Sequence, residues 1–159
     1  MIFVILGTQR FPMNRVIDEI DSLIEKGFLK REEVIIQNGY SKDSKYSTCY
    51  QMIGEEKFDD LLSRSNLIIT HGGTSSIIKA LRSNKKTIIV PRKAVFAEHV
   101  DDHQKEICEI FKNEGFAEVI EDIKELEDVI KRVQCNKYNE LNLSNQLPNY
   151  ILNNVLGIN

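Results

Sequence analysis

The sequence has no tryptophan, and its 159 residues include only three cysteines and three prolines. The cysteines lie far apart and without the CxxC spacing of zinc-binding or redox motifs, at Cys49, Cys108 and Cys135. They therefore predict neither a metal site nor a disulfide framework, and they fit a reducing, cytoplasmic environment.

Long hydrophobic runs are absent as well. The apolar opening of the chain, residues 1–6, is too short for a signal sequence, lacks a basic leader and runs directly into Gly7, so it is predicted to be a strand. No segment approaches the roughly 20 apolar residues of a membrane-spanning helix. Any membrane association is therefore expected to be peripheral or to depend on a partner.

An excess of positive charge is also missing, since the formal net charge is −3. Neutralising many phosphates requires a basic surface, which argues against a general nucleic-acid binder. Locally, however, the stretch from Lys79 to Lys93 holds six basic residues and no acidic one. This stretch either meets an anion or consists of solvated basic side chains on a helix face and a loop.

What the chain does contain is enough apolar residues, 42%, for the core of one domain. Its apolar runs are short, rich in β-branched residues and almost without polar alternation, as in strands covered on both faces. Strands are predicted at residues 2–6, 34–37, 67–70 and 87–90, with weaker ones at 49–53 and 116–120. Apolar residues at three- and four-residue spacing predict helices at 14–25, 55–64, 74–83, 100–114 and 123–133. This order predicts an α/β fold with a Rossmann-like, doubly wound, mostly parallel sheet.

The predicted domain spans residues 1–135. Beyond it the composition shifts toward asparagine, and the apolar run at 150–156 predicts a short amphipathic helix. The tail, residues 136–159, is expected either to fold back on the domain or to supply a surface for a partner.

Ligands of open α/β sheets bind outside the carboxyl ends of the strands, so the loops after residues 6, 37, 70 and 90 form the candidate site. The loop after residue 70 carries the strongest signal, because glycines and hydroxyl residues precede a predicted helix in His71-Gly72-Gly73-Thr74-Ser75-Ser76. A helix start presents unpaired N–H groups and a positive dipole end, which bind anions such as diphosphate. The alternative is an ordinary Ser or Thr N-cap after a glycine turn. Neither a Walker A lysine nor a GxGxxG pattern is present here.

The loop after residue 90 contains a dense polar stretch, Glu98-His99-Val100-Asp101-Asp102-His103-Gln104. His99 and His103 are four residues apart, as two zinc ligands on one helix face are, but Val100 stands where zinc proteases need glutamate. No metal site is therefore predicted. The stretch either binds sugar and ribose hydroxyls or caps the following helix, and its pairing with the His71–Ser76 loop favours sugar binding.

These motifs together resemble the C-terminal domain of glycosyltransferase family 28. The resemblance lies in a strand followed by His-Gly-Gly-x-Ser-Ser, a helix, a strand ending in Val-Pro, and Glu-His-x-x-Asp-His-Gln. More narrowly, the sequence is similar to small bacterial capsule and exopolysaccharide glycosyltransferase subunits, relatives of the catalytic subunit of the dolichol-pathway UDP-N-acetylglucosamine transferase. The opening Gly7-Thr8-Gln9 also matches, and the resemblance extends to about residue 114 and more weakly to 133.

The resemblance implies the donor-binding half of a GT-B enzyme that is divided between two polypeptides. UDP-sugar is then a substrate, and no cofactor is expected. A membrane-associated partner subunit would hold the lipid-linked saccharide acceptor, which places this chain in the cytoplasm at the inner face of the cell membrane. The implied reaction is metal-independent, inverting transfer of a hexose, with galactose favoured, in capsule or exopolysaccharide synthesis. The alternative is a non-catalytic UDP- or nucleotide-binding regulatory module.

Carried onto this sequence, the resemblance predicts the site residues. Contacts to UDP and its diphosphate are predicted for Gly7, Thr8, Gly72, Gly73, Thr74, Ser75, Ser76 and Arg92, with Lys93 as a further cationic helper. Sugar contacts are predicted for Asp102, His103 and Gln104. The candidates for the general base are His71, Glu98 and His99, unless the base belongs to the partner. Lys79 departs from the family pattern, because the larger family-28 enzymes carry a ribose-binding glutamate there.

Overall fold

The computed structural model describes residues 1–100 and 104–141. These residues form one sheet of six parallel strands in the order β3-β2-β1-β4-β5-β6. The strands are β1 (Ile2–Ile5), β2 (Val34–Gln37), β3 (Thr48–Tyr50), β4 (Leu67–His71), β5 (Lys86–Val90) and β6 (Glu118–Val119). The strand order reverses between β1 and β4, so the predicted doubly wound, Rossmann-like α/β fold is confirmed.

The helices follow the predicted pattern closely. They are α1 (Asn14–Glu25), α2 (Glu55–Arg64), α3 (Thr74–Arg82), α4 (Gln104–Asn113) and α5 (Leu126–Cys135). The first two have the predicted bounds, and α3 ends one residue earlier. The described part of α4 begins at Gln104, directly after residues 101–103, which the structure does not describe. A 3₁₀ turn, Ile123–Glu125, precedes α5. The helix predicted at residues 150–156 lies outside the described residues.

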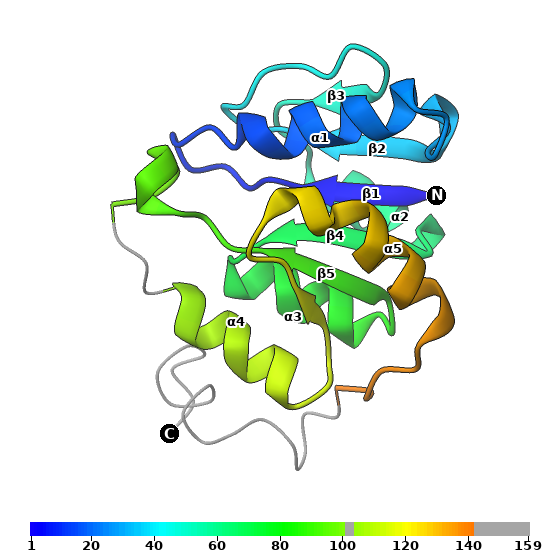
Figure 1. The fold of residues 1–159 in the computed structure, drawn as a ribbon, viewed down its shortest axis with the longest axis vertical. Helices are drawn as coiled ribbons and strands as arrows, with labels where there is room; N and C mark the ends of the chain where they lie inside the picture. The colour runs from blue at the N-terminus through cyan, green and yellow to red at the C-terminus, as the bar shows by residue number, and fades with distance from the viewer. Residues whose placement is uncertain (101–103, 142–159) are drawn as a thin grey trace.

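The helices cover both faces of the sheet, as Figure 1 shows. Helices α1 and α5 pack on one face against Ile2, Val4 and the neighbouring strand residues of the same pleat. On the opposite face, α2 and α3 pack against Phe3 and Ile5, and α3 and α4 pack against β5 and β6. Every residue of β1 is buried, which explains why its sequence lacks polar alternation.

Helix α1 shows how the apolar spacing specifies this packing. Its residues Val16, Ile17, Ile20 and Leu23 recur at three- and four-residue intervals, and each is 0% exposed. Burying one such side chain contributes about 2 kcal/mol relative to leaving it in water. The amphipathic pattern therefore fixes which face of α1 meets the sheet.

The first residues of the predicted tail pack on the domain. The Tyr138 hydroxyl donates to Glu118 Oε1 at 2.9 Å, and the Asn139 N–H donates to the Gly115 carbonyl at 2.9 Å. Leu141 is 8% exposed and belongs to the core between α3 and α4. Residues 136–141 thus continue the domain surface, while the proposed boundary at residue 135 stays a prediction. Within the described residues, no helix is long and apolar enough to cross a membrane.

Candidate functional site

A cavity of about 550 Å³ opens at the carboxyl ends of β1 and β4, where the strand order reverses. This is the position at which doubly wound sheets bind ligands. One wall is formed by the loop after β1 and by the start of α3, and the other by the segment that leads into α2. The lining residues are Ile5, Gly7, Thr8, Gln9, Gln37, Met52, Ile53, Phe58, His71, Gly73, Thr74, Ser75 and Ser76.

The start of α3 supplies the polar wall of this cavity. Gly73 is the N-cap residue and no side chain caps the helix, so the ordinary Ser or Thr N-cap considered from the sequence is not formed. The Ser76 N–H is the first to pair within the helix, donating to the Gly73 carbonyl at 3.1 Å. The N–H groups of Thr74 and Ser75 precede it and have no intrahelical acceptor. With the hydroxyls of Thr74 to Ser76, they form a row of hydrogen-bond donors of the kind that can bind an anion.

His71 ends β4 and forms the base of the cavity. Its side chain is 8% exposed, and Nδ1 lies 3.3 Å from the Ile5 carbonyl oxygen. Burial, and secondarily the charge of Arg92, lower the pKa of His71 from 6.5 to about 4. The ring is therefore neutral at pH 7, and the carbonyl at Nδ1 assigns the proton to that nitrogen, leaving Nε2 as an acceptor. A group with a pKa this low is poorly matched to the predicted role of general base.

Two glycines in the cavity wall are required by the imidazole of His71. A β-carbon at position 73 would lie 2.3 Å from His71 Nε2, and one at position 7 would lie 2.7 Å away. Gly7 also has a φ of +79°, which side-chain-bearing residues rarely adopt. Gly72, in contrast, is buried and does not line the cavity. Gly7 and Gly73 thus shape the site by letting the backbone approach the ring.

Gln37 was not among the residues predicted to form the site. Its side chain closes a two-way contact with Gly7, accepting from the Gly7 N–H at 3.2 Å and donating to the Gly7 carbonyl at 3.1 Å. The backbone amide of Gly7 is therefore already paired and not turned toward a ligand. The available sequence signal was a glutamine at the end of an otherwise apolar, buried strand. Nothing in the local pattern of Met52, Ile53 or Phe58 marked them as the apolar wall.

Arg92, for which a phosphate contact is predicted, is buried and lies outside the lining of the cavity. Its side chain is 1% exposed and is absent from the cavity lining. Its guanidinium donates instead to three backbone carbonyls, those of Leu6, Phe11 and Glu98. Because those donors are used inside the protein, this geometry favours a structural role for Arg92, and its contact with the diphosphate stays a prediction.

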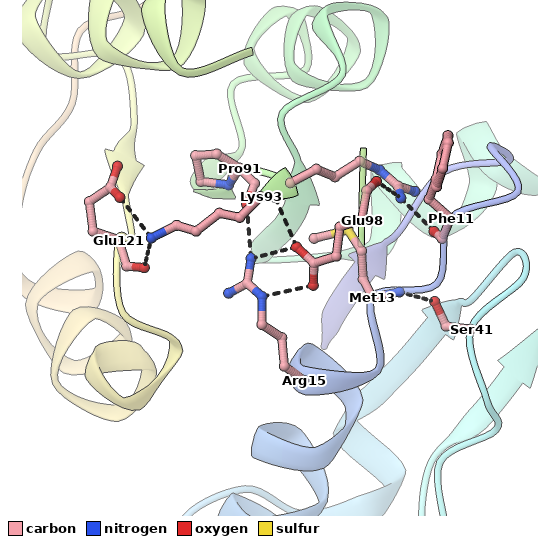
Figure 2. Close-up of polar contacts among 9 residues, drawn as sticks. Phe11, Met13, Arg15, Ser41, Pro91, Lys93, Glu98 and Glu121 are labelled. Atoms are coloured by element: carbon pink, nitrogen blue, oxygen red, sulfur yellow. Dashed lines mark hydrogen bonds and ion pairs between the residues drawn. The ribbon is translucent and has the colours of Figure 1, made fainter. Parts of the chain in front are cut away.

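Glu98 and Lys93 are also engaged in contacts of their own (Figure 2). Arg15 binds the Glu98 carboxylate through Nε at 2.8 Å and Nη2 at 3.0 Å, and the Lys93 N–H donates to Glu98 Oε2 at 3.1 Å. The Lys93 ammonium pairs with Glu121 Oε2 at 2.8 Å. Glu98 is 2% exposed. This geometry favours a structural role for both residues over the predicted base and cationic helper.

The remaining predicted residues lie apart from the cavity wall or beyond the described chain. The ring of His99 is half-buried, with its centroid 6.0 Å from that of Phe11. Gln104 is the first residue of α4, whereas Asp102 and His103 lie outside the described residues. Lys79, one helical turn beyond Ser75, pairs with Glu55 on α2 at 3.1 Å.

Comparison with known families and curated proteins gives a consistent result. Residues 1–151 match the glycosyltransferase family 28 C-terminal domain. The chain is 35% identical over 94 residues to the UDP-N-acetylglucosamine transferase subunit ALG13 of Candida albicans, covering 59% of this chain and 29% of that protein. It is 44% identical over 50 residues to the ALG13 subunit of Candida glabrata, covering 31% of this chain and 23% of that one. The chain thus spans less than a third of these curated relatives.

Solved structures show the same fold. Acinetobacter baumannii MurG superposes with a TM-score of 0.57 at 15% identity, covering 82% of this chain and 40% of MurG. A glycotransferase of kitacinnamycin superposes with a TM-score of 0.58 at 13% identity, covering 86% of this chain and 35% of that one. At such identities the likeness concerns the fold alone.

Proposed function

Because this chain belongs to glycosyltransferase family 28, whose C-terminal domain it matches over residues 1–151, we propose that it is the donor-binding subunit of a two-part hexosyltransferase that uses a UDP-sugar. The observation that carries this proposal is the start of α3, which presents unpaired N–H groups and hydroxyls to a cavity at the reversal point of the sheet. Diphosphate is the anion that this combination of donors fits.

The two walls of the cavity suit the two ends of a nucleoside diphosphate. Thr74, Ser75 and Ser76 offer donors to the phosphates, and Thr8 adds a hydroxyl from the loop after β1 on the same wall. Met52, Ile53 and Phe58 form an apolar wall against which a planar base would pack. The loop after β5 leads to Asp102, His103 and Gln104, for which we propose the sugar contacts.

Helix α3 has a direct role in the proposed chemistry. When the glycosidic bond to the donor breaks, negative charge develops on the leaving UDP diphosphate. The N–H groups and the positive dipole end at Thr74 stabilise that charge without reorganisation, as oxyanion-hole donors do. Neither Arg92 nor Lys93 is placed to share this role, because both are held by protein partners.

The proton of the acceptor hydroxyl must pass to a base, and the described residues favour a base outside this chain. His71 has a pKa of about 4, and the Glu98 carboxylate is held by Arg15 and by the Lys93 N–H. His99 remains the candidate within this chain. We therefore propose that the partner subunit, which holds the lipid-linked acceptor, supplies the base.

The partner, the location and the transferred sugar complete the proposal. The matched curated proteins are named as subunits, which supports a partner subunit for this chain. A membrane-associated partner and a cytoplasmic, peripheral location are the parts of the proposal implied by the sequence resemblance alone. Galactose transfer in capsule or exopolysaccharide synthesis is the role implied by the sequence resemblance. The names of the curated relatives make N-acetylglucosamine the competing sugar.

Titration calorimetry of the full chain with UDP, ADP and uridine tests the donor site. We expect UDP to bind more tightly than ADP, a comparison that tests recognition of the base. We also expect UDP to bind more tightly than uridine, which lacks the phosphates. Equal affinity for UDP and uridine would exclude the proposed diphosphate surface.

Transfer is tested with membranes from a strain of the source organism in which the gene for this chain has been deleted. The purified chain is added to them together with UDP-galactose or UDP-N-acetylglucosamine. Release of UDP and labelling of lipid-linked saccharide are expected with one donor. If UDP binds but neither sugar is transferred, the chain is the non-catalytic nucleotide-binding module instead.

A further inference from the structure

The cavity at the reversal point of the sheet is lined by no charged side chain among the described residues. Its polar lining consists of the donors at the start of α3, the hydroxyl of Thr8, the amides of Gln9 and Gln37, and the imidazole of His71. The diphosphate of a UDP-sugar carries a negative charge on each phosphate. Within this lining, His71 is the titratable side chain that can become a cation near neutral pH.

The His71 ring is oriented so that its Nε2 atom points between two glycines of the cavity wall. Nδ1 lies 3.3 Å from the Ile5 carbonyl oxygen on β1, which fixes the other side of the ring. A β-carbon at position 73 or at position 7 would come closer to Nε2 than to any other ring atom, at 2.3 Å and 2.7 Å. Nε2 therefore lies between Gly7 and Gly73, both of which line the cavity.

The two glycines leave this nitrogen uncovered. A methyl group at either position would overlap the ring and stand over Nε2. Among the described residues, the ring is hydrogen-bonded at Nδ1 and has no partner at Nε2. Because the proton resides on Nδ1, Nε2 presents a lone pair. The cavity thus holds an uncommitted acceptor beside the donors of Thr74 and Ser75.

An acceptor at this place is unsuited to a phosphate as long as it stays neutral. Phosphate oxygens of a UDP-sugar carry no hydrogen near neutral pH, so they and the Nε2 lone pair repel each other. Protonation of Nε2 converts the acceptor into a charged donor. Burial opposes that change and keeps the pKa of the free ring at about 4. A charge of opposite sign within about 4–6 Å moves a pKa by roughly 1 to 3 toward the charged form, so the phosphates can offset the burial.

The charged groups around His71 do not supply such a negative charge. β1, the end of β2 and the first turn of α3 contain no charged side chain, and Arg10 in the loop after β1 is exposed. The charge of Arg92, after β5, lowers the pKa of His71 further. Lys79, farther along α3, pairs with Glu55 on α2. Two more charged residues after β5 are engaged in ion pairs, Glu98 with Arg15 and Lys93 with Glu121. The negative charge must therefore come from a ligand.

We propose that the diphosphate of the donor binds over Nε2 of His71 and that this nitrogen takes up a proton as the complex forms. The proton comes from the solvent and makes a new N–H bond at Nε2, while Nδ1 keeps its proton and its contact with Ile5. The imidazolium then donates to a phosphate oxygen. The complex holds one proton more than the separate partners, so binding strengthens as the pH falls. This inference rests on the proposed donor-binding function and adds to it a cation beside the leaving diphosphate.

Calorimetry with UDP-galactose or UDP-N-acetylglucosamine, whichever the wild type binds, measures the proton uptake. Both phosphates of these donors are esterified and do not titrate near neutral pH, unlike the terminal phosphate of UDP, so the protein is the source of any pH dependence. We expect the Kd to fall roughly tenfold from about pH 8 to about pH 5.5, a range in which the free ring stays neutral. At about pH 6, the heats in two buffers of different ionisation enthalpy should show uptake of roughly half to one proton. Binding without proton uptake overturns the proposal.

The His71→Asn variant assigns the uptake to this ring, because asparagine cannot take up a proton. Whatever its absolute affinity, its Kd for the same donor should vary by less than about twofold over this pH range. A variant that keeps the pH dependence of the wild type contradicts the proposal.

Nitrogen NMR of the assigned His71 ring in the wild type provides the test if the variant does not fold. At about pH 6 the free chain should carry a proton on Nδ1 alone, and the complex should carry protons on both nitrogens. A ring that stays neutral in the complex overturns this inference and leaves the donor-binding function standing. Failure to bind either donor would overturn both.

Discussion

The imidazole of His71 lies so close to Gly73 that a β-carbon at position 73 would be 2.3 Å from His71 Nε2. The glycine at the N-cap of α3 is therefore required by a side chain two residues earlier, and the backbone geometry at the start of the helix depends on that contact. His71 is in turn fixed by the Ile5 carbonyl at 3.3 Å.

Gly73→Ala should displace either His71 or the first turn of α3, because the alanine methyl and the ring cannot occupy the same space. We expect UDP affinity to fall more than tenfold, roughly 1.4 kcal/mol or more, as measured by calorimetry. Gly54→Ala is the matched control, since Gly54 is also a helix N-cap with a similar φ, −69° against −74°, and a methyl group added there would meet nothing within 4 Å. Wild-type affinity in Gly73→Ala would show that His71 does not constrain the site.

Ser75→Ala combined with Ser76→Ala removes two hydroxyls from the polar wall of the cavity. Each neutral hydrogen bond lost should weaken UDP binding by about 1 kcal/mol, and the double variant by roughly thirtyfold. Ser83→Ala, at the other end of α3, should bind UDP like the wild type. If the double variant keeps full affinity, the phosphates do not bind at the start of α3.

The stability of the chain should fall in mild acid because of His71. The unfolded chain takes up a proton near pH 6.5, whereas the folded chain does so only at about pH 4. The contribution of His71 to the free energy of unfolding is therefore fully present above pH 6.5. It decreases as the pH falls toward 4, and the free energy of unfolding drops by roughly 3 kcal/mol over that window. Urea unfolding of wild type and His71→Asn across this range isolates the contribution, since asparagine keeps a donor for Ile5 but does not titrate. Parallel pH profiles for the two proteins would contradict the neutral, buried imidazole.

Glu98→Gln should destabilise the fold, because it leaves the Arg15 guanidinium without its carboxylate. Side-chain exposure is 14% for Arg15 and 2% for Glu98, so breaking this pair should cost about 3 kcal/mol in urea unfolding. The exposed pair Arg64–Asp60, at 63% and 55%, provides the control, and Asp60→Asn should cost less than about 1 kcal/mol. If Glu98→Gln is as stable as wild type, the pair is not structural and the predicted base role regains support.

Gln104→Ala should affect the sugar and spare the nucleotide. Loss of one neutral hydrogen bond predicts about 1 kcal/mol weaker binding of the UDP-sugar, with unchanged binding of UDP. Gln134→Ala, at an exposed position on α5, serves as the control for both ligands. An equal loss of affinity for UDP and UDP-sugar would place Gln104 outside the sugar pocket.

The strands and helices were predictable because their signals are local. The β-branched run in β1 reflects a strand that is buried on both faces. The three- and four-residue spacing in α1 reflects a helix that is buried on one face. Both patterns are visible within a few residues of the sequence. The loop from His71 to Ser76 was predicted in the same way, because glycine and hydroxyl residues before a helix are a local signal for a helix start that can bind an anion. The sequence by itself therefore determined the fold class, and it predicted the edge of the sheet and the helix start at which we propose that the phosphates bind.

The tertiary structure alone decided what the basic and polar side chains around that surface do. Arg92 and Lys93 had the charge expected of diphosphate helpers, yet Arg92 bonds carbonyls at positions 6, 11 and 98, and Lys93 pairs with Glu121. Gln37 bonds Gly7 from 30 residues away. Such contacts join distant segments, and the approach of those segments depends on how the whole sheet and its helices pack. The presence of a charged or amide side chain in the sequence therefore does not identify the partner that it contacts in the folded chain.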